Sequence, residues 1–242
     1  LAPERALAEA GRLDSRLARG EARDAALAGV PCPIKDLSPV AGVGFEAGSA
    51  VLRGNIAAQD DALVGWLAAA GTVMLGKTTV PEFGLPCYTE PETAAPARTP
   101  WDLSRSAGGS SGGAAAAVAA GIVPLAHGSD AGGSLRIPAS ACGLVGLKAS
   151  RGRISSGLLR EPGPGLGTDG VLSRTVRDTA VALDVLAGPR RGDTYHAPAP
   201  AGGFLAACED RIQGLRVGVL TTPVIAAAAV HPACLAAAAI TG

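Results

Sequence analysis

The sequence predicts an α/β fold. Short apolar runs alternate along the chain with longer segments of helical character, and this alternation is typical of sheets packed against helices. Of the 242 residues, 48% are hydrophobic but only 3% are aromatic, so we expect a core of small aliphatic side chains. A chain of this length can bury one substantial core.

Four segments are predicted to be helices. Residues 3–28 place leucines among Arg, Glu and Asp at amphipathic spacing, and residues 175–187 show the same kind of pattern. Residues 60–70 begin with two aspartates and end at Gly71, which suits a helix at both ends. The alanine-rich run at 112–120 is the fourth, and the last residues of the chain, from position 231, read as the opening of a helix.

Strands are expected where short apolar runs lie between turn residues. Val30–Ile34 carries two prolines, so it is predicted to be an edge strand or an extended loop that delivers Lys35 and Asp36. The other apolar runs are residues 72–75, 122–125, 142–147 and 215–220, and the loops or linkers are expected at residues 81–106, 151–170 and 188–203.

Two glycine-flanked serine clusters mark the middle of the chain, GGSSGG at residues 108–113 and DAGGS at residues 130–134. Glycine lets backbone segments approach closely and adopt positive φ. The second cluster also offers consecutive backbone N–H groups that can line an oxyanion hole. The simpler interpretation is a pair of glycine-rich loops on an ordinary α/β domain.

Residues 108–139 resemble the signature of the amidase signature family, the serine hydrolases that use a Ser–cis-Ser–Lys triad. The resemblance implies that Ser134 is the nucleophile and that Ser110 is the bridging serine, preceded by a cis peptide bond. The third member is implied to be Lys35, in the upstream PIKDL segment. The spacings between these three positions are also usual in that family.

The same resemblance assigns further residues around the triad. It implies an oxyanion hole built from the backbone N–H groups of Ala131, Gly132, Gly133 and Ser134. It also implies that Ser111, Asp130 and Arg136 brace the site by hydrogen bonds, a role that largely coincides with a plain structural ion pair between Asp130 and Arg136. Ser129 replaces the usual threonine and keeps the hydroxyl.

The family's fold is an α/β fold with a mixed β-sheet core flanked by helices on both faces. The resemblance therefore implies that residues 1–242 form a single amidase domain. We expect this domain to be truncated, incomplete at both ends, because the chain begins with Leu, its last segment stops within a helix, and family members are usually much longer.

The implied activity is hydrolysis of a linear carboxylic amide to an acid and an amine or ammonia, with no metal and no organic cofactor. Ser134 would attack the carbonyl while Ser110 passes its proton to neutral Lys35, whose pKa must then lie well below the reference of about 10.4. Two alternatives stay open: a glutaminase-type subunit of a tRNA-dependent amidotransferase and an inactive fragment. Ile137-Pro138 favours a stand-alone amidase, because the amidotransferase subunit typically has Gln-Pro.

Two other motifs point to different classes of protein. Residues 71–78 match the P-loop pattern GxxxxGK[ST], which would make Lys77 a nucleotide-binding residue. Residues 108–112 match the GxSxG nucleophile elbow, which needs a preceding apolar strand and a catalytic histidine. Neither context is predicted, and His127 is interpreted as a packed histidine rather than a base.

Charge and cysteine usage limit the possible partners. The formal net charge is zero, so no nucleic-acid partner is expected, and the five scattered cysteines form no CxxC pair or metal-site spacing. This cysteine usage fits a reducing cytoplasm. We expect no signal peptide and no membrane span, a small-molecule amide as the partner, and a homodimer as an open possibility.

Overall fold

The computed structural model describes residues 1–157, 165–194, 196–210, 213–223 and 228–241. The chain divides into two compact units, Leu1–Cys208 and Glu209–Gly242, and each is described on its own. Every element up to α6 belongs to the first unit, and α7 belongs to the second.

The described helices include the four predicted segments, as α1, α2, α3 and α5, and the helix predicted from position 231, as α7. Helices α4 and α6 are additional. The helices are α1 (Pro3–Ala18), α2 (Ala62–Ala69), α3 (Gly112–Ala119), α4 (Arg136–Cys142), α5 (Val176–Leu186), α6 (Gly203–Ala207) and α7 (Pro232–Thr241), with 3-10 turns η1 (Ala50–Leu52) and η2 (Glu82–Gly84). The strands are β1 (Ile34–Lys35), β2 (Lys77–Thr78), β3 (Arg98–Thr99), β4 (Asp102–Ser106), β5 (Leu125–Asp130), β6 (Val145–Gly146) and β7 (Thr168–Ser173).

The helix boundaries follow local chemistry. The Asp61 carboxylate accepts a hydrogen bond from Leu63 N at 3.3 Å and caps α2, and the Thr175 hydroxyl accepts one from Asp178 N at 3.1 Å and caps α5. The first helix is shorter than predicted, because Gly20 adopts a φ of +74° just after Ala18 and turns the chain.

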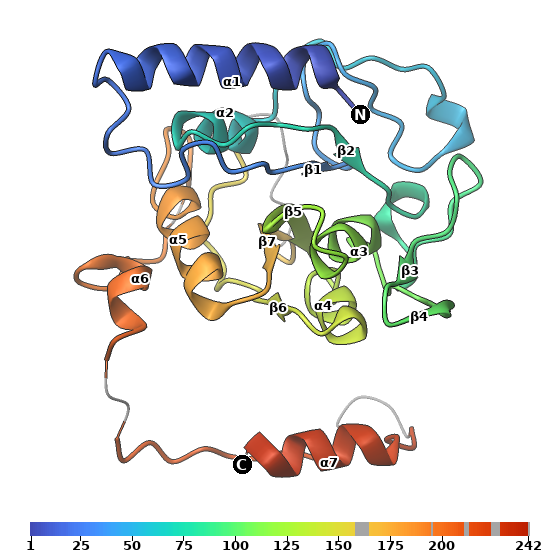
Figure 1. The fold of residues 1–242 in the computed structure, drawn as a ribbon. Coiled ribbons are helices and arrows are strands. Elements are labelled where there is room, and N and C mark those ends of the chain that lie inside the picture. The colour runs from blue at the N-terminus through green and yellow to red at the C-terminus, as the bar shows by residue number, and fades with distance from the viewer. Residues whose placement is uncertain (158–164, 195, 211–212, 224–227, 242) are drawn as a thin grey trace. The chain divides into compact units, whose positions relative to one another are not determined.

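A three-stranded antiparallel sheet, in the order β5-β7-β6, lies at the centre of the first unit (Figure 1). Alternate side chains of β5 and β7 point to opposite faces, as expected for strands. Leu125 and Val171 join one hydrophobic cluster, whereas Ala126 and Leu172 join the other. The first cluster includes Leu63, Leu67, Leu183 and Leu186 of α2 and α5, and the second includes Ala114, Ala115, Val118 and Ala139 of α3 and α4.

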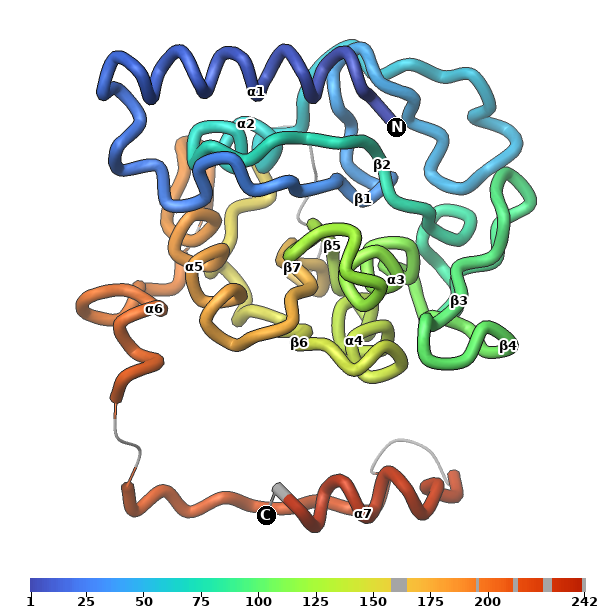
Figure 2. The backbone as a smooth tube through the Cα atoms, in the orientation of Figure 1, coloured from blue at the N-terminus to red at the C-terminus, as the bar shows by residue number. Residues whose placement is uncertain are grey.

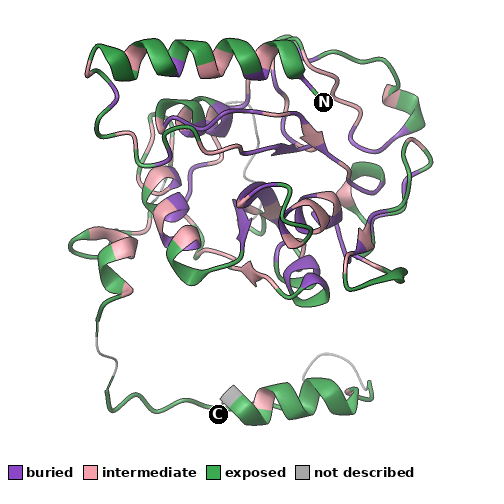
Figure 3. Cartoon of the chain, viewed as in Figure 1, coloured by how far each residue is buried: buried purple, intermediate pink, exposed green. Residues whose placement is uncertain are grey.

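Helices therefore cover both faces of this sheet, which confirms the predicted α/β layering. The burial pattern follows it, since β5, β7 and the inner faces of α3 and α5 are buried (Figure 3). Among the described residues, parallel and antiparallel strand pairs are both present, but they lie in separate small sheets rather than in one mixed sheet. Strand β1 pairs with β2 in parallel, and β3 pairs with β4 in antiparallel orientation. Figure 2 shows β1 and β2 side by side although distant in sequence.

Several predicted strands are shorter than expected or absent. In the 72–75 run only Val73 forms a β-bridge, to Pro31. The strand itself, β2, begins later, where Lys77 and Thr78 pair with β1. Cys142 ends helix α4, so the 142–147 run keeps only β6. Residues 215–220 are exposed and form no strand, because no partner strand is described within their unit. The prediction of β structure there was wrong.

The 81–106 segment, predicted to be a loop, contains the hairpin of β3 and β4. Part of the predicted 151–170 loop lies outside the described residues, and its end forms the start of β7. Within the part of the chain that is described, none of the helices combines the length and apolar character needed to cross a membrane.

Close backbone packing makes a testable prediction about two helical glycines. A Cβ on Gly113 would lie 2.5 Å from Thr79 N and 2.6 Å from Thr79 O, whereas a Cβ on Gly65 meets nothing within 4 Å. We expect Gly113→Ala to destabilise the chain by about 1–3 kcal/mol because backbone has to move. The matched change Gly65→Ala should stabilise it by about 0.5–1 kcal/mol through helix propensity. Thermal unfolding of both variants tests this, and equal melting temperatures would contradict it.

Candidate active site

Lys35 is a fully buried lysine at the end of β1. Its Nζ lies 2.8 Å from the Ser110 Oγ and donates to the Ser129 carbonyl oxygen at 3.2 Å. A neutral amine has both hydrogens to donate and a lone pair to accept a hydroxyl hydrogen. Both contacts can be made by a neutral amine as well as by an ammonium.

Ser110 follows a cis peptide bond from Gly109, as the sequence resemblance implies, and is 1% exposed. Its neighbouring glycines are required by close contacts. A Cβ on Gly109 would lie 2.7 Å from Tyr88 N, and a Cβ on Gly112 would lie 2.4 Å from Thr89 Oγ1. The serine therefore lies in a segment that packs directly on the backbone of Tyr88 and on the side chain of Thr89.

Thr89 is a buried residue that holds this segment in place, and it was not among the residues predicted from the sequence. Its hydroxyl donates to the Gly108 carbonyl oxygen at 2.9 Å and accepts from Gly112 N at 3.2 Å, so one side chain holds both ends of the Ser110 turn. No local pattern around Thr89 indicates this role, because the partners are far away in sequence.

Ser134 is half-buried in the turn that leads into α4. Its carbonyl oxygen accepts a hydrogen bond from Ser111 N at 3.2 Å, which joins the two serine clusters directly. The Ser111 hydroxyl donates in turn to the Ser129 carbonyl oxygen at 3.3 Å. Strand β1, the start of α3 and the turn before α4 thus bring Lys35, Ser110 and Ser134 into one region.

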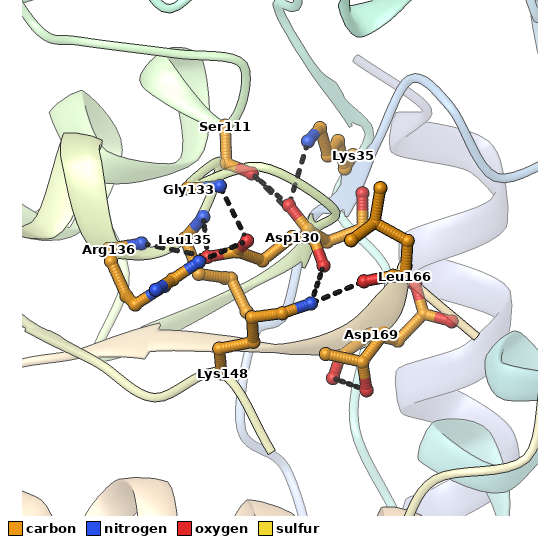
Figure 4. Close-up of polar contacts among 11 residues, drawn as sticks. Lys35, Ser111, Asp130, Gly133, Leu135, Arg136, Lys148, Leu166 and Asp169 are labelled. Atoms are coloured by element: carbon orange, nitrogen blue, oxygen red, sulfur yellow. Dashed lines mark hydrogen bonds and ion pairs between the residues drawn. The ribbon is translucent and has the colours of Figure 1, made fainter. Parts of the chain in front are cut away.

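Asp130 is a buried carboxylate at the end of β5 that organises the second glycine cluster (Figure 4). Its oxygens accept from Gly133 N at 2.7 Å and Leu135 N at 3.1 Å, and from Arg136 Nε at 2.9 Å and Nη2 at 3.1 Å. Burial alone would raise the pKa of Asp130, but the hydrogen bonds from Arg136 and the backbone outweigh it and lower the pKa to about 2. The carboxylate is therefore charged and fully engaged.

In the turn from Ala131 to Ser134, one backbone N–H group is bonded to Asp130 and the other three are not. Gly133 N–H is committed to Asp130 and is not free to bind an oxyanion. Among the hydrogen bonds between described residues, none is donated by the N–H of Ala131, Gly132 or Ser134. Ala131 and Gly132 are exposed, so their N–H groups lie near the surface of the turn.

Lys148 is a second residue that the sequence analysis did not assign. Its Nζ donates to the Asp130 carbonyl oxygen at 2.9 Å and also contacts the Leu166 carbonyl oxygen (Figure 4). Lysine is rare in this chain, at positions 35, 77 and 148 only, and that rarity is the signal that could have drawn attention to it.

Lys77 does not adopt a P-loop arrangement. Its Nζ donates to Asp36 Oδ1 at 2.7 Å and to the Ser38 carbonyl oxygen at 2.8 Å. Burial lowers the pKa of Lys77, while the Asp36 carboxylate acts in the opposite direction. The preceding residues run as extended chain into β2, and the element that follows is the short turn η2 rather than a helix. This segment offers no helix N-terminus to a phosphate.

The described residues contain no group of three or more His, Cys, Asp or Glu side chains arranged to hold a metal ion. His127 is buried, with Nδ1 at 3.2 Å from Lys35 N and Nε2 at 3.2 Å from Asp169 Oδ1. It is thus a packed histidine, as predicted.

Comparison with known protein families matches residues 1–241 to the family described as Amidase. The chain belongs to the amidase family. The sequence-based recognition of this family and of its fold is thereby confirmed.

The chain is 45% identical to the 6-aminohexanoate-cyclic-dimer hydrolase of Paenarthrobacter ureafaciens over 238 residues, which are 96% of this chain and 47% of that protein. It is 43% identical over 216 residues to a glutamyl-tRNA(Gln) amidotransferase subunit of Anaeromyxobacter sp. (strain K), covering 89% of this chain and 44% of the relative. The chain therefore spans about half the length of the curated relatives it matches.

Solved structures show the same relationship. The structure of a 6-aminohexanoate cyclic dimer hydrolase superposes with a TM-score of 0.86 at 40% identity, covering 99% of this chain and 50% of that one. The peptide amidase of Stenotrophomonas maltophilia gives a TM-score of 0.71 at 33% identity, covering 82% and 42% respectively. The chain thus shares its fold with amide-hydrolysing enzymes.

The lowered pKa of Asp130 predicts a specific pH dependence of stability. A folded pKa of about 2, below the reference of 3.8, means that the stabilisation is complete above pH 4 and is lost as the pH falls towards 2. We expect Asp130→Asn to lower the free energy of unfolding at pH 7 by about 1–2 kcal/mol, since Arg136 is partly exposed to solvent. Its stability should also fall less steeply than that of the parent between pH 4 and pH 2.

Urea unfolding at several pH values measures this difference. Asp14→Asn, on the exposed face of α1, controls for the loss of one negative charge. Parallel pH profiles for the parent and Asp130→Asn would contradict the assignment.

Proposed function

We propose that the protein containing this chain hydrolyses a carboxylic amide to an acid and an amine or ammonia through an acyl-enzyme on Ser134. The observation that supports this most directly is the 2.8 Å contact between the buried Lys35 Nζ and the Ser110 Oγ. The backbone hydrogen bond from Ser111 to Ser134, at 3.2 Å, connects this pair to the proposed nucleophile.

In the proposed mechanism, Ser134 Oγ attacks the amide carbonyl while Ser110 accepts its proton. Ser110 passes its own proton to neutral Lys35, whose Nζ lies 2.8 Å from that hydroxyl oxygen. The Ser129 carbonyl oxygen accepts a hydrogen bond from Nζ at 3.2 Å and so holds the amine beside Ser110. Burial supports the neutral form of the lysine that this step needs.

The negative charge on the tetrahedral intermediate would be stabilised by the backbone N–H groups of Ala131, Gly132 and Ser134. Gly133 N–H, which the sequence resemblance also implied, serves instead to hold the Asp130 carboxylate. Asp130, Arg136 and Ser111 are proposed to brace the turn, so that the N–H groups keep their directions during the reaction.

The proton on Lys35 then returns through Ser110 to the departing amine, and the amine leaves. Water attacks the acyl-enzyme by the same relay, which releases the acid and restores Ser134. The proposed relay uses side chains of this chain alone, with no metal or organic cofactor as a reactant.

The proposed substrate class is a small amide, either linear, as the sequence resemblance implies, or cyclic. It is supported by the likeness to a hydrolase of a cyclic 6-aminohexanoate dimer, at 45% identity. The glutaminase-type subunit is the alternative, and Ile137 at the start of α4, in place of the usual Gln, favours the stand-alone amidase. A cytoplasmic location is supported by the free cysteines at positions 32, 87, 142, 208 and 234. A homodimer is left open.

Labelling by a fluorophosphonate probe tests the proposed nucleophile. We expect the purified chain to be modified at Ser134, with modification abolished in Ser134→Ala. In Lys35→Ala the rate of labelling should fall by about 10²-fold or more, because the base is lost. Mass spectrometry of the digested protein identifies the modified residue.

The control variant is Ser140→Ala, since Ser140 is an exposed serine of α4, close to Ser134 in sequence. It should be labelled at the parent rate. Absence of labelling in a folded parent chain would mean that the triad is not assembled in it, and labelling of another serine would overturn the assignment.

A further inference from the structure

His127 is a buried histidine of β5 that binds the backbone of the proposed catalytic lysine. Lys35 N–H donates to its Nδ1 at 3.2 Å, and its Nε2 lies 3.2 Å from Asp169 Oδ1 on β7. His127 is 0% exposed and Asp169 is 4% exposed. A peptide N–H can only donate, so Nδ1 must carry the lone pair, and the ring hydrogen is on Nε2 facing the carboxylate.

The ring occupies the position of a backbone hydrogen bond between β1 and β5. His127 N donates to the Pro33 carbonyl oxygen at 3.0 Å, as in a parallel ladder. The next bond of a regular ladder would run from Lys35 N to the carbonyl oxygen of residue 127. Here Lys35 N donates to the side chain of that residue instead. The imidazole therefore sets the separation between the two strands at Lys35.

Both ends of Lys35 are consequently attached to the same strand. Its backbone N–H is held by the ring of His127, and its Nζ donates to the carbonyl oxygen of Ser129, two residues further along β5. Asp169 is the cross-strand neighbour of Ser129 in the β5–β7 pairing. The pair His127–Asp169 thus lies where a small change in strand separation would move Nζ relative to Ser110.

We propose that His127, with its tautomer fixed by Asp169, is a positioning residue for Lys35. The ring contacts the main chain of the lysine rather than its amine, so it acts through Lys35 and exchanges no proton with substrate. The inference rests on the proposed function in one respect, namely that Lys35 is the base of the relay. A histidine that merely fills the core would affect stability alone.

Three substitutions separate these two roles. His127→Asn keeps an acceptor at the place of Nδ1, His127→Gln keeps a donor near Nε2 but loses that acceptor, and His127→Leu loses both. Val171→Ala is the control, because Val171 is buried opposite His127 on β7 and its side chain cannot form a hydrogen bond. The rate constant for fluorophosphonate labelling of Ser134 and the melting temperature are measured for each variant.

We expect His127→Gln and His127→Leu to label about 10- to 100-fold more slowly than the parent, because the lysine is misplaced. His127→Asn should recover most of that rate, to within about threefold of the parent, and Val171→Ala should label at close to the parent rate. Equal rates for the Asn and Gln variants, or rates that follow melting temperature across all four, would overturn the proposal.

A second measurement does not depend on activity. The lysine side chains are at positions 35, 77 and 148, so ¹³C-labelled lysine gives three Cε signals, assigned by replacing Lys77 and Lys148 with arginine. The Lys35 signal should move in His127→Leu and His127→Gln but much less in His127→Asn or Val171→Ala. Ring ¹⁵N spectra should show hydrogen on Nε2, and hydrogen on Nδ1 would overturn the proposal.

The two measurements separate the two hypotheses. If the parent chain is not labelled, the proposed function fails in this chain, and the lysine signal still decides whether His127 positions Lys35. If the parent is labelled and the lysine signal is unmoved in His127→Leu, the proposed function stands and the positioning role is wrong.

Discussion

The burial of Lys35 is the constraint on which the rest of the structure depends. A lysine amine removed from water needs hydrogen-bond partners, and it finds them in the Ser110 hydroxyl and the Ser129 carbonyl oxygen. These partners come from the turn before α3 and from β5, so both elements have to lie within hydrogen-bond distance of β1. The packing around the site keeps β5 and the turn before α3 at hydrogen-bond distance from Lys35.

Small residues are what allow so close an approach. Ala114, Ala115 and Val118 of α3 are fully buried against the central sheet. Of the glycines beside Ser110, Gly109 packs against the backbone of Tyr88 and Gly112 packs against the side chain of Thr89. A larger side chain at any of these places would push α3 away from β5 and lengthen the contacts to Lys35. The small side chains of alanine and glycine are therefore needed at these positions for α3 to pack closely against β5.

Sequence motifs and apolar periodicity predict helices and candidate site residues, but they do not predict contacts between residues that are far apart in the sequence. Lys35, Ser110 and Ser134 are identified as candidate residues by their flanking sequence. Helix α2 is predicted from its first-turn aspartates and Gly71, α5 from its apolar spacing and α3 from its alanine-rich run. The roles of Thr89 and Lys148 depend on partners in other elements, so nothing in their own neighbourhood indicates them. The apolar run at 215–220 shows the opposite failure, since a strand requires a partner as well as a suitable sequence.

The negative charge of Asp130 lies close to the proposed oxyanion hole and is compensated by Arg136. A buried carboxylate next to a proposed oxyanion hole would repel the developing negative charge if it stood alone. Arg136 binds both of its oxygens, keeps it ionised and places a positive charge beside it, and Lys148 lies against the carbonyl oxygen of the same residue. The carboxylate can therefore hold Gly133 N–H and Leu135 N–H inward without opposing negative charge at the outward-facing groups. A neutral residue at this position would spare the repulsion but could not accept so many hydrogen bonds, which is why an ion pair suits the turn better than an amide would.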